Sequence, residues 1–348
     1  MVDVDKIRIS IGSAVKLGLK KLKVDVLPTN CHLLTYHPDG CIGNCGFCPQ
    51  SQHTHQLLTD SDEDQEHLSR VLWPSFELNH VLEIFKEKFP TFNRSENGFQ
   101  RICIQSLNYD KFESDVDAIL RKLRKATNIP ISIAIPPVSE KKIQFYKDIG
   151  VDRICFALDT ATPELFESVK GSGCEGPYSW DEHISLLKKS VEIFGRGYVS
   201  THLIIGFGET EREILEFVQH MKDLGVRSGF FAFFPVQKTR FETRSRPNLI
   251  SFRKSQLGKF LLDTQKWKIS DFQFNDNGEL QLFPIDTLEL QRIIAISAPF
   301  ETSGCPGCNR PYYTSSPREE QYNYPCKISI SEQEKIYAEL SEYCRSAP

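Results

Sequence analysis

The stretch Cys41-Ile42-Gly43-Asn44-Cys45-Gly46-Phe47-Cys48 places three cysteines at offsets of four and three, with two glycines among them. On a short glycine-bearing loop, thiolates at this spacing can converge on one face. Cysteine thiolates are the usual ligands of iron–sulfur clusters. Three of them leave the fourth iron of a four-iron cluster without a protein ligand. This cysteine loop therefore predicts a cluster with an open coordination position.

A zinc knuckle is the alternative interpretation of the same residues. Structural zinc takes four closed ligands, and His37 and His53 are the nearby candidates for the fourth. Gaps of three and two residues between the cysteines are uncommon in zinc sites, so we favour iron.

Outward from the cysteine loop, short apolar runs alternate with helical stretches as far as about residue 297. The pattern predicts strands over 31–37, 99–105, 131–135, 153–158, 198–205 and 230–235. It predicts helices over 112–125, 140–149, 162–169, 181–194, 211–224 and 252–265. This alternation indicates βαβ units with a parallel sheet. The fold class expected is α/β, a full or partial TIM-type (β/α) barrel, in which sites lie on the loops after strands.

Three regions are expected along the chain. Residues 1–30 are predicted to be an N-terminal helical extension, with an amphipathic helix over 6–24, because Ile11, Val15, Leu19 and Leu22 fall on one face. Its lysines would be solvated or would bind a partner. Residues 31–298 are predicted to form the barrel, and residues 299–348 a C-terminal segment with its own cluster.

Composition limits the classes of protein that the chain can represent. It has 348 residues, of which 40% are hydrophobic and 25% charged, as in soluble globular proteins. A net charge of −4 predicts no nucleic-acid partner. No apolar run approaches the ~20 residues that span a membrane, and no signal-peptide core is present, so we expect a cytoplasmic protein without membrane association. Six of the 11 cysteines lie in 41–48 and 305–326, which favours bound iron over disulfides.

A second feature is the run Ile204-Ile205-Gly206-Phe207-Gly208-Glu209-Thr210, in which an apolar strand ends and a helix begins. Glycines let the backbone approach a ligand closely, and Thr210 is suited to cap the helix. A tight strand–helix turn without any ligand also explains the glycines.

A third feature is the C-terminal knuckle Cys305-Pro306-Gly307-Cys308, followed by Cys326. This spacing suits either zinc or a second iron–sulfur cluster. Because no histidine follows His220, a zinc site built from this segment would lack a fourth local ligand. We therefore favour a second cluster on Cys305, Cys308 and Cys326, with its fourth ligand open among Ser315, Ser316, Arg310 and Cys31.

The cysteine loop resembles the signature of the radical S-adenosylmethionine (radical SAM) superfamily. The resemblance implies that Cys41, Cys45 and Cys48 hold a [4Fe-4S] cluster. It also implies that S-adenosylmethionine occupies the open iron and is cleaved to a 5′-deoxyadenosyl radical. Phe47 stands where the signature has its aromatic residue.

The same resemblance assigns further cofactor-binding residues. Ile204, Gly206 and Glu209 match the superfamily's ribose and adenine contact, and Gly208 lies within that turn. Asp159, at the end of the fourth strand, would bind cofactor or substrate, or would cap the next helix. Two positions depart from the pattern. His202 stands where glycine usually opens this strand's motif, and residues 104–108 read Ile-Gln-Ser-Leu-Asn instead of a glycine-glycine-acid turn.

The core and the helix beginning at Phe252 resemble the biotin-synthase-like branch. The tail from Ser303 to Tyr313 is similar to a subunit of the two-protein lipoyl synthase. That likeness implies sulfur insertion into an octanoyl chain, with a second [4Fe-4S] cluster sacrificed as the sulfide source. The partners implied are an octanoylated lipoyl carrier protein or octanoyl-lysine peptide, a second radical SAM subunit, and a ferredoxin- or flavodoxin-type electron donor. Alternatives are another auxiliary-cluster radical SAM enzyme, or a zinc or iron–sulfur binding protein without radical chemistry.

Overall fold

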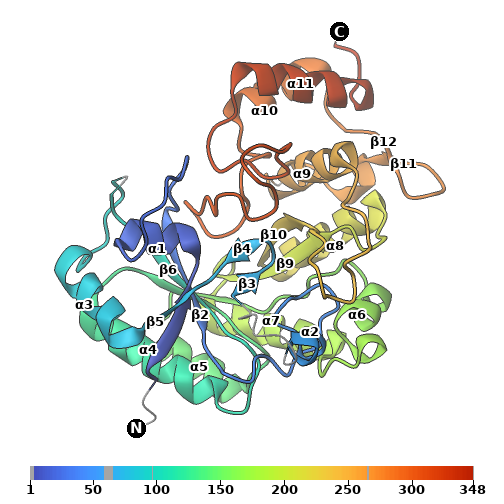
Figure 1. The fold of residues 1–348 in the computed structure, drawn as a ribbon. Helices are drawn as coiled ribbons and strands as arrows, with labels where there is room; N and C mark the ends of the chain where they lie inside the picture. The colour runs from blue at the N-terminus through green and yellow to red at the C-terminus, as the bar shows by residue number, and fades with distance from the viewer. Residues whose placement is uncertain (1–3, 59–65, 96, 265, 348) are drawn as a thin grey trace.

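The computed structural model describes residues 4–58, 66–95, 97–264 and 266–347. Within these residues an eight-stranded sheet with the order β10-β9-β8-β7-β6-β2-β1-β5 forms the centre of the molecule (Figure 1). Six consecutive strands of that order are parallel: β2 (Asn30–Thr35), β6 (Arg101–Gln105), β7 (Ile131–Ala134), β8 (Arg153–Cys155), β9 (Val199–Ile205) and β10 (Val226–Ala232). This is a partial TIM-type barrel, as the sequence predicts.

Helices connect the parallel strands, because a parallel pair needs a long crossover. They are α3 (Leu78–Lys88), α4 (Phe112–Ala126), α5 (Glu140–Asp148), α6 (Pro163–Val169), α7 (Trp180–Phe194) and α8 (Glu211–Leu224), and α9 (Leu249–Asp263) follows the last parallel strand. In α4, Val116, Leu120 and Leu123 are buried, whereas Arg121 and Lys125 are exposed. Full burial of each such leucine stabilises the fold by about 1.5–3 kcal/mol. The helical period in the sequence thus predicted the face that packs on the sheet.

The start of α8 confirms the predicted cap. The Thr210 hydroxyl accepts a hydrogen bond from Glu213 N–H at 3.2 Å, and the Glu213 carboxylate accepts one from Thr210 N–H at 2.7 Å. This reciprocal pair satisfies two backbone donors that the helix itself leaves free, and it fixes where the preceding glycine-rich turn ends.

The predicted helix over 6–24 is wrong. Strand β1 (Lys6–Ile9) comes first, followed by the short helix α1 (Ile11–Leu17), which Gly18 ends with a φ of 82°. β1 pairs antiparallel with both β2 and β5 (Ser75–Glu77). The N-terminal residues therefore belong to the main sheet, because Ile7 and Ile9 bury their side chains against β2 rather than along a helix face.

Between β2 and β5 lie α2 (Gln52–Leu58) and the hairpin β3 (His67–Leu68) and β4 (Val71–Leu72). The sequence over 53–75 predicts a solvated loop and a helix start, and the acidic run within it, residues 59–64, lies outside the described residues.

The C-terminal part packs against α9. It contains the hairpin β11 (Gln273–Phe274) and β12 (Leu280–Leu282) and the helices α10 (Thr287–Ile296) and α11 (Ile330–Leu340). The 3₁₀ turns of the chain are Ser172–Cys174, Ile269–Asp271 and Ser341–Tyr343. Figure 1 shows α10 and α11 beyond α9, away from the N-terminal strands. Arg253 of α9 is fully buried, where it pairs with Glu339 of α11 and donates to Tyr324 Oη at 3.2 Å. In the described part of the chain no helix combines the length and apolarity needed to cross a membrane.

Candidate metal and cofactor site

A cavity of about 220 Å³ lies at the carboxyl ends of the parallel strands. Cys41, Cys45 and Cys48 all line it, as do three other predicted site residues, Phe47, Asp159 and Ile204. The structure therefore brings together the cysteine loop after β2 and the ends of β8 and β9, as expected for a (β/α) barrel.

The loop after β6 holds the first cysteine. Cys41 Sγ accepts hydrogen bonds from the backbone N–H groups of Gly43 and Asn108, both at 3.3 Å. Ile42 N–H in turn donates to Asn108 O at 2.8 Å. The residues that replace the superfamily's glycine-glycine-acid turn thus have a role of their own, because they fix the cysteine loop through backbone atoms.

Glycine is required at two positions of the cysteine loop. A Cβ at Gly46 would lie 2.7 Å from the Phe241 ring, and a Cβ at Gly43 would lie 2.7 Å from Tyr178 Oη. Gly46 also donates its N–H to Val169 O at 2.8 Å and accepts a hydrogen bond from Phe241 N–H at 3.0 Å. The two glycines therefore let other loops close tightly over the three cysteines.

Burial raises the pKa of these thiols, whereas nearby positive charge lowers it. Burial raises the pKa of Cys45 well above its ordinary value and that of Cys48 to about 12, while the ammonium group of Lys170 lowers both. Without a metal the thiols are therefore protonated. Metal ligation requires thiolates, and three half-buried cysteines beside one buried cation make a donor set that fits an anionic iron–sulfur cluster.

Lys170 was not predicted as a site residue. Its ammonium lies 2.8 Å from an Asp159 carboxylate oxygen, and both side chains are buried in the cavity wall. Burial by itself would lower the pKa of Lys170, but Asp159 and Cys45 raise it overall. Asp159 adopts a φ of 65°. The N-cap of α6 is Thr162, so the alternative role of Asp159 as a helix cap is wrong.

The glycine-rich turn after β9 is arranged differently from its prediction. Ile204 lines the cavity, whereas Gly206, Gly208 and Glu209 are not among its lining residues. The Glu209 carboxylate accepts hydrogen bonds from Gly206 N–H at 2.5 Å and Phe207 N–H at 3.0 Å. Burial raises the pKa of Glu209. In this structure Glu209 orders its own turn, and direct contact of these three residues with a cofactor stays a prediction.

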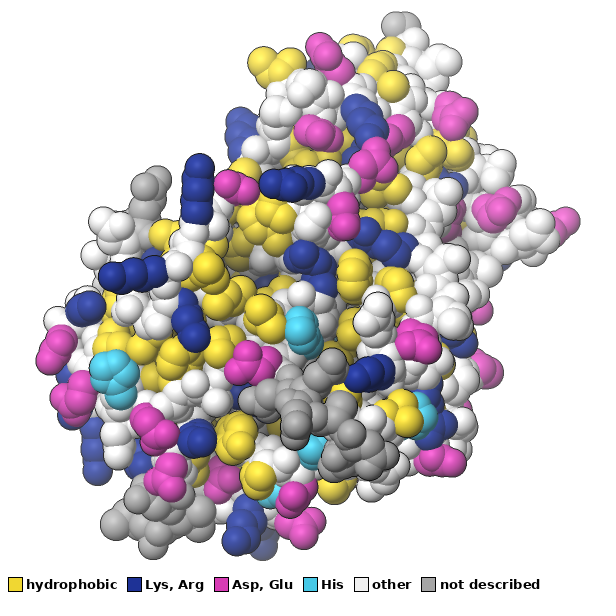
Figure 2. Space-filling view, viewed as in Figure 1, with side chains coloured by type: hydrophobic (Ala, Val, Ile, Leu, Met, Phe, Trp, Pro, Cys, Tyr) yellow, Lys and Arg dark blue, Asp and Glu magenta, His cyan; other side chains and the backbone are white. Residues whose placement is uncertain are grey.

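Another part of the cavity wall is aromatic and comes from two distant segments. Phe231, Phe233 and Phe234 of the β10 region line it, together with Arg310 and Tyr313 of the C-terminal segment. The Arg310 guanidinium stacks on the Tyr313 ring at 3.9 Å and donates to Gln105 Oε1 at 3.1 Å. In Figure 2, hydrophobic side chains gather in the middle of this face, with Lys and Arg side chains among them.

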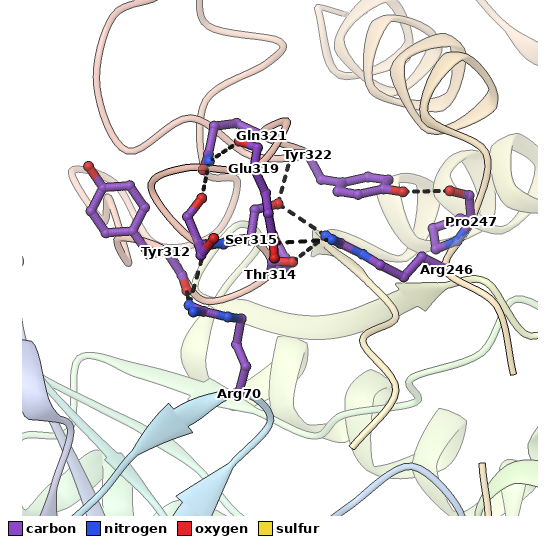
Figure 3. Close-up of polar contacts among 10 residues, drawn as sticks. Arg70, Arg246, Pro247, Tyr312, Thr314, Ser315, Glu319, Gln321 and Tyr322 are labelled. Atoms are coloured by element: carbon purple, nitrogen blue, oxygen red, sulfur yellow. Dashed lines mark hydrogen bonds and ion pairs between the residues drawn. The ribbon is translucent and has the colours of Figure 1, made fainter. Parts of the chain in front are cut away.

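Two arginines of the barrel hold the C-terminal segment on that wall (Figure 3). Arg70 donates to Tyr312 O at 2.5 Å, and Arg246 donates to Thr314 O at 2.6 Å. Arg246 also lies 3.3 Å from the Glu319 carboxylate. Charge-assisted hydrogen bonds are stronger than neutral ones, so residues 310–319 are fixed by side chains that come from both ends of the barrel sequence.

The C-terminal knuckle lies beside a second cavity. Cys305 and Cys308 both line it. Cys308 Sγ lies 3.8 Å from His32 Nε2, on β2. Cys326 is exposed and is not among the residues that line this cavity or the first. Across the described ranges, no three His, Cys, Asp or Glu side chains form a group that could hold a single metal ion.

A profile of the radical SAM superfamily matches residues 35–221. That match covers more than half of the chain, which therefore belongs to this superfamily. Membership implies a [4Fe-4S] cluster and S-adenosylmethionine, and the donor set of Cys41, Cys45 and Cys48 fits that cluster.

Curated relatives indicate a branch of the radical SAM superfamily. A biotin synthase of Clostridium acetobutylicum is 23% identical over 202 residues, covering 56% of this chain and 53% of that protein. A biotin synthase of Carboxydothermus hydrogenoformans is 23% identical over 221 residues, covering 62% of this chain and 60% of that protein. The chain thus matches a biotin-synthase-like branch at low identity, and it spans only about half to three fifths of these relatives.

Two solved structures match parts of the chain at low identity. The FeFe-hydrogenase maturase HydG of Carboxydothermus hydrogenoformans gives a TM-score of 0.48 at 14% identity, covering 65% of this chain and 50% of its own. Methylornithine synthase (PylB) gives a TM-score of 0.46 at 14% sequence identity, covering 71% of this chain and 67% of its own length.

Proposed function

We propose that this chain is a radical SAM enzyme that inserts sulfur at an unactivated C–H bond of an octanoyl chain on a lipoyl carrier protein. The observation that supports the proposal most is the arrangement around the first cavity. The cysteine loop lines it together with Arg310 and Tyr313, which belong to the same C-terminal segment that carries the knuckle. A substrate in this cavity would contact both segments.

Residues of the chain have distinct roles in this proposal. Cys41, Cys45 and Cys48 would hold the [4Fe-4S] cluster, and Cys305 and Cys308 would hold a second cluster. When bound, these groups and S-adenosylmethionine supply a hydrogen-abstracting radical and a sulfide. The buried pair of Lys170 and Asp159 orders the wall beneath the cysteine loop, and the wall's hydrophobic residues exclude water from the reacting carbon.

The lining of the cavity supports the proposed substrate class. A saturated acyl chain offers no hydrogen-bonding group, so its binding depends on apolar contact. Phe231, Phe233, Phe234 and Tyr313 provide apolar surface in the cavity wall. An apolar strand end at this position suits a channel for an acyl chain.

The curated relatives favour a second candidate substrate. They are biotin synthases, and biotin carries its sulfur in a ring, so sulfur insertion is plausible for this chain with a free small molecule as acceptor. Arg310 would then bind a substrate carboxylate, which a carrier-bound octanoyl amide does not have.

The test compares the two substrates under anaerobic conditions after reconstitution with iron and sulfide. The chain is supplied with reductant, S-adenosylmethionine and either an octanoyl-lysine peptide or the sulfur-free precursor of biotin, with and without a second radical SAM subunit. We expect 5′-deoxyadenosine together with a thiolated peptide whose mass rises by one sulfur atom per insertion. Thiolation of the biotin precursor alone would replace the lipoyl proposal with the second candidate.

A matched control variant tests the roles of the two groups of cysteines separately. The variant Cys305→Ala/Cys308→Ala is expected to keep 5′-deoxyadenosine formation, lose thiolation and lose about half the iron if each cluster has equal nuclearity. Absence of 5′-deoxyadenosine from the unmodified chain would reject the enzyme proposal. A ferredoxin or flavodoxin and the second subunit are proposed partners, and each is tested by adding it to the same assay.

A further inference from the structure

A third cavity, of about 280 Å³, lies between the segment that follows α1, the hairpin of β3 and β4, and the C-terminal segment. All three segments contribute apolar side chains to its wall, among them Val24, Val26, Val71, Trp73 and Tyr312. Its charged lining residues are Lys23, Asp25, Arg70 and Arg310. The wall is therefore suited to an apolar group, and positive charge predominates around it.

Two side chains lie between this third cavity and the first cavity, which contains the cysteine loop. Arg310 and Tyr313 line both. The backbone that carries them is held from the side of the third cavity, where Arg70 donates to Tyr312 O at 2.5 Å (Figure 3). A chain that enters the third cavity and extends past Arg310 and Tyr313 would therefore reach the first cavity.

Positive charge is concentrated in the segment that borders the third cavity. The residues from Lys6 to Val24 include six Lys or Arg and no Asp or Glu, although the whole chain has a net charge of −4. Lys20, Lys21 and Lys23 are exposed, and in the described part of the chain none of the three forms an ion pair. Exposed charges of one sign attract and orient a partner of the opposite sign.

Three large apolar side chains are exposed in the same region. Leu22 is 55% exposed, Leu27 39% and Leu72 40%. Leu22 lies between the lysines in the sequence, and Leu72 lines the third cavity. Single surface leucines need no explanation, but apolar side chains gathered beside a cavity, with charged residues next to them, are typical of a protein interface.

We propose that a docking surface, formed by Lys20–Lys23, Leu27 and Leu72, binds an acidic face of the protein that carries the substrate. The octanoyl-lysine arm of that protein then passes through the third cavity, and past Arg310 and Tyr313, to the cysteine loop. The proposal rests on the carrier-bound substrate of the proposed function. A free small molecule would require neither an acidic surface nor the third cavity.

The test measures the binding of three fluorescent peptides to the reconstituted full chain by fluorescence anisotropy under anaerobic conditions. Each peptide contains one octanoyl-lysine, flanked by Asp and Glu, by Asn and Gln, or by Lys and Arg. We expect the acidic peptide to bind most tightly, and its affinity to fall as salt is raised. The variant Lys20→Gln/Lys21→Gln/Lys23→Gln should weaken binding of the acidic peptide about tenfold, because three modest ion pairs are lost. Binding of the neutral peptide should stay nearly unchanged.

Two further variants control for misfolding and for net charge. Lys20→Glu/Lys21→Glu/Lys23→Glu should transfer the preference to the basic peptide, which a misfolded protein would not do. Lys125→Gln/Lys141→Gln/Lys188→Gln removes three exposed lysines from α4, α5 and α7 and should keep the preference for the acidic peptide. Equal binding of the three peptides, an equal loss in this control, or a preference that does not reverse would overturn the proposal.

The path of the arm is tested by photo-crosslinking. The acidic peptide carries a diazirine in the side chain of its octanoyl-lysine, and the labelled residues are identified by mass spectrometry after irradiation. We expect labels at residues 24–26 and 71–73, which line the third cavity and not the first. Labels that avoid both ranges would show that the arm takes another path and would overturn the proposal.

The same reagents separate failure of the docking surface from failure of the proposed function. A preference for the acidic peptide with labels in the third cavity, but without any thiolated product, would support the docking surface and reject sulfur insertion. Thiolation that is independent of the flanking charge would retain sulfur insertion and overturn the docking surface. The proposal is also overturned if the lysines serve another partner. That result would be binding to anionic phospholipid vesicles, or self-association in sedimentation, that the Gln variant abolishes while the three peptides bind equally.

Discussion

The cysteine loop at 41–48 and the C-terminal knuckle at Cys305–Cys308 are held in place in different ways. The loop is fixed by elements of the barrel that follow it, through Asn108, Val169 and Phe241, and its glycines allow the close approach. The knuckle is fixed by Thr29, which lies 278 positions before Gly307 and 280 before Asn309. The position of the cysteine loop is therefore set by the barrel elements that follow it, whereas the position of the knuckle depends on a contact between the two ends of the chain.

The largest effect on stability is expected at the buried ion pair of Lys170 and Asp159, beneath the cysteine loop. Lys170→Met leaves the Asp159 carboxylate buried without its counter-ion, which costs ~3–5 kcal/mol of stability. Urea unfolding of the metal-free protein measures this loss. The double variant Lys170→Met/Asp159→Leu is the control and should recover most of it. Equal losses in both variants would show that packing, not charge, accounts for the effect.

The next largest effect is expected from steric crowding at the cysteine loop, which should leave the knuckle unaffected. Gly46→Ala places a methyl group 2.7 Å from the Phe241 ring, and such overpacking costs ~1–3 kcal/mol. We expect iron on the cysteine loop to be lost while iron on the knuckle is kept, as measured by iron and sulfide content after reconstitution. Adding Phe241→Ala should restore loading. Full iron in Gly46→Ala alone would contradict the close packing described here.

A smaller effect is expected on the side of the knuckle. Arg246→Met removes charged hydrogen bonds to Thr314 O and Ser315 Oγ, worth ~1.5–3 kcal/mol locally. Amide hydrogen exchange over 310–322 should accelerate, while exchange over 41–48 stays unchanged. The exposed pair of Arg292 and Glu289 provides a control, since Arg292→Met should alter stability by less than ~1 kcal/mol. Equal acceleration in both regions would show that they are not independently held.

The smallest effect concerns His183, which packs edge-on against Tyr178 beside the cysteine loop. Burial lowers the pKa of His183 to about 3, whereas an unfolded histidine titrates near 6.5. The unfolded chain therefore gains a proton that the folded chain excludes, and stability falls as the pH drops below about 6.5. From pH 7 to 5.5, His183→Asn should lose less stability than the unmodified protein by about 1 kcal/mol. Identical pH profiles would contradict a buried neutral imidazole.

The sequence predicted most of the barrel because each βα unit carries its own period. Helix α4 and strand β9 were predicted within two residues of their observed bounds, since their apolar faces are set locally. Strand β1 was missed because the spacing of Ile11, Val15 and Leu19 was extended backward, although Ile7 and Ile9 alternate as in a strand. Its pairing with β2 depends on contacts that a local pattern does not contain.

The candidate site also contains residues that the sequence could predict and residues that it could not. The cysteines of the loop were placed by spacing alone, and the structure brings them to one cavity. Lys170 and His32 could not have been selected, because a lysine at a helix end and a histidine in a strand are ordinary until the fold sets them against Asp159 and Cys308. Glu209 matched a motif, but its carboxylate is occupied by the N–H groups of its own turn.

The end of β6 and the loop after it contact both the cysteine loop and the segment that follows the knuckle, within four residues. Gln105 Oε1 accepts the hydrogen bond from Arg310, two positions beyond the knuckle, and Asn108 N–H donates to Cys41 Sγ. Metallation of the two centres should therefore be cooperative. A shift of this short backbone segment when one centre fills would change the affinity of the other for iron, so the partly loaded forms should be scarcer than independent binding predicts.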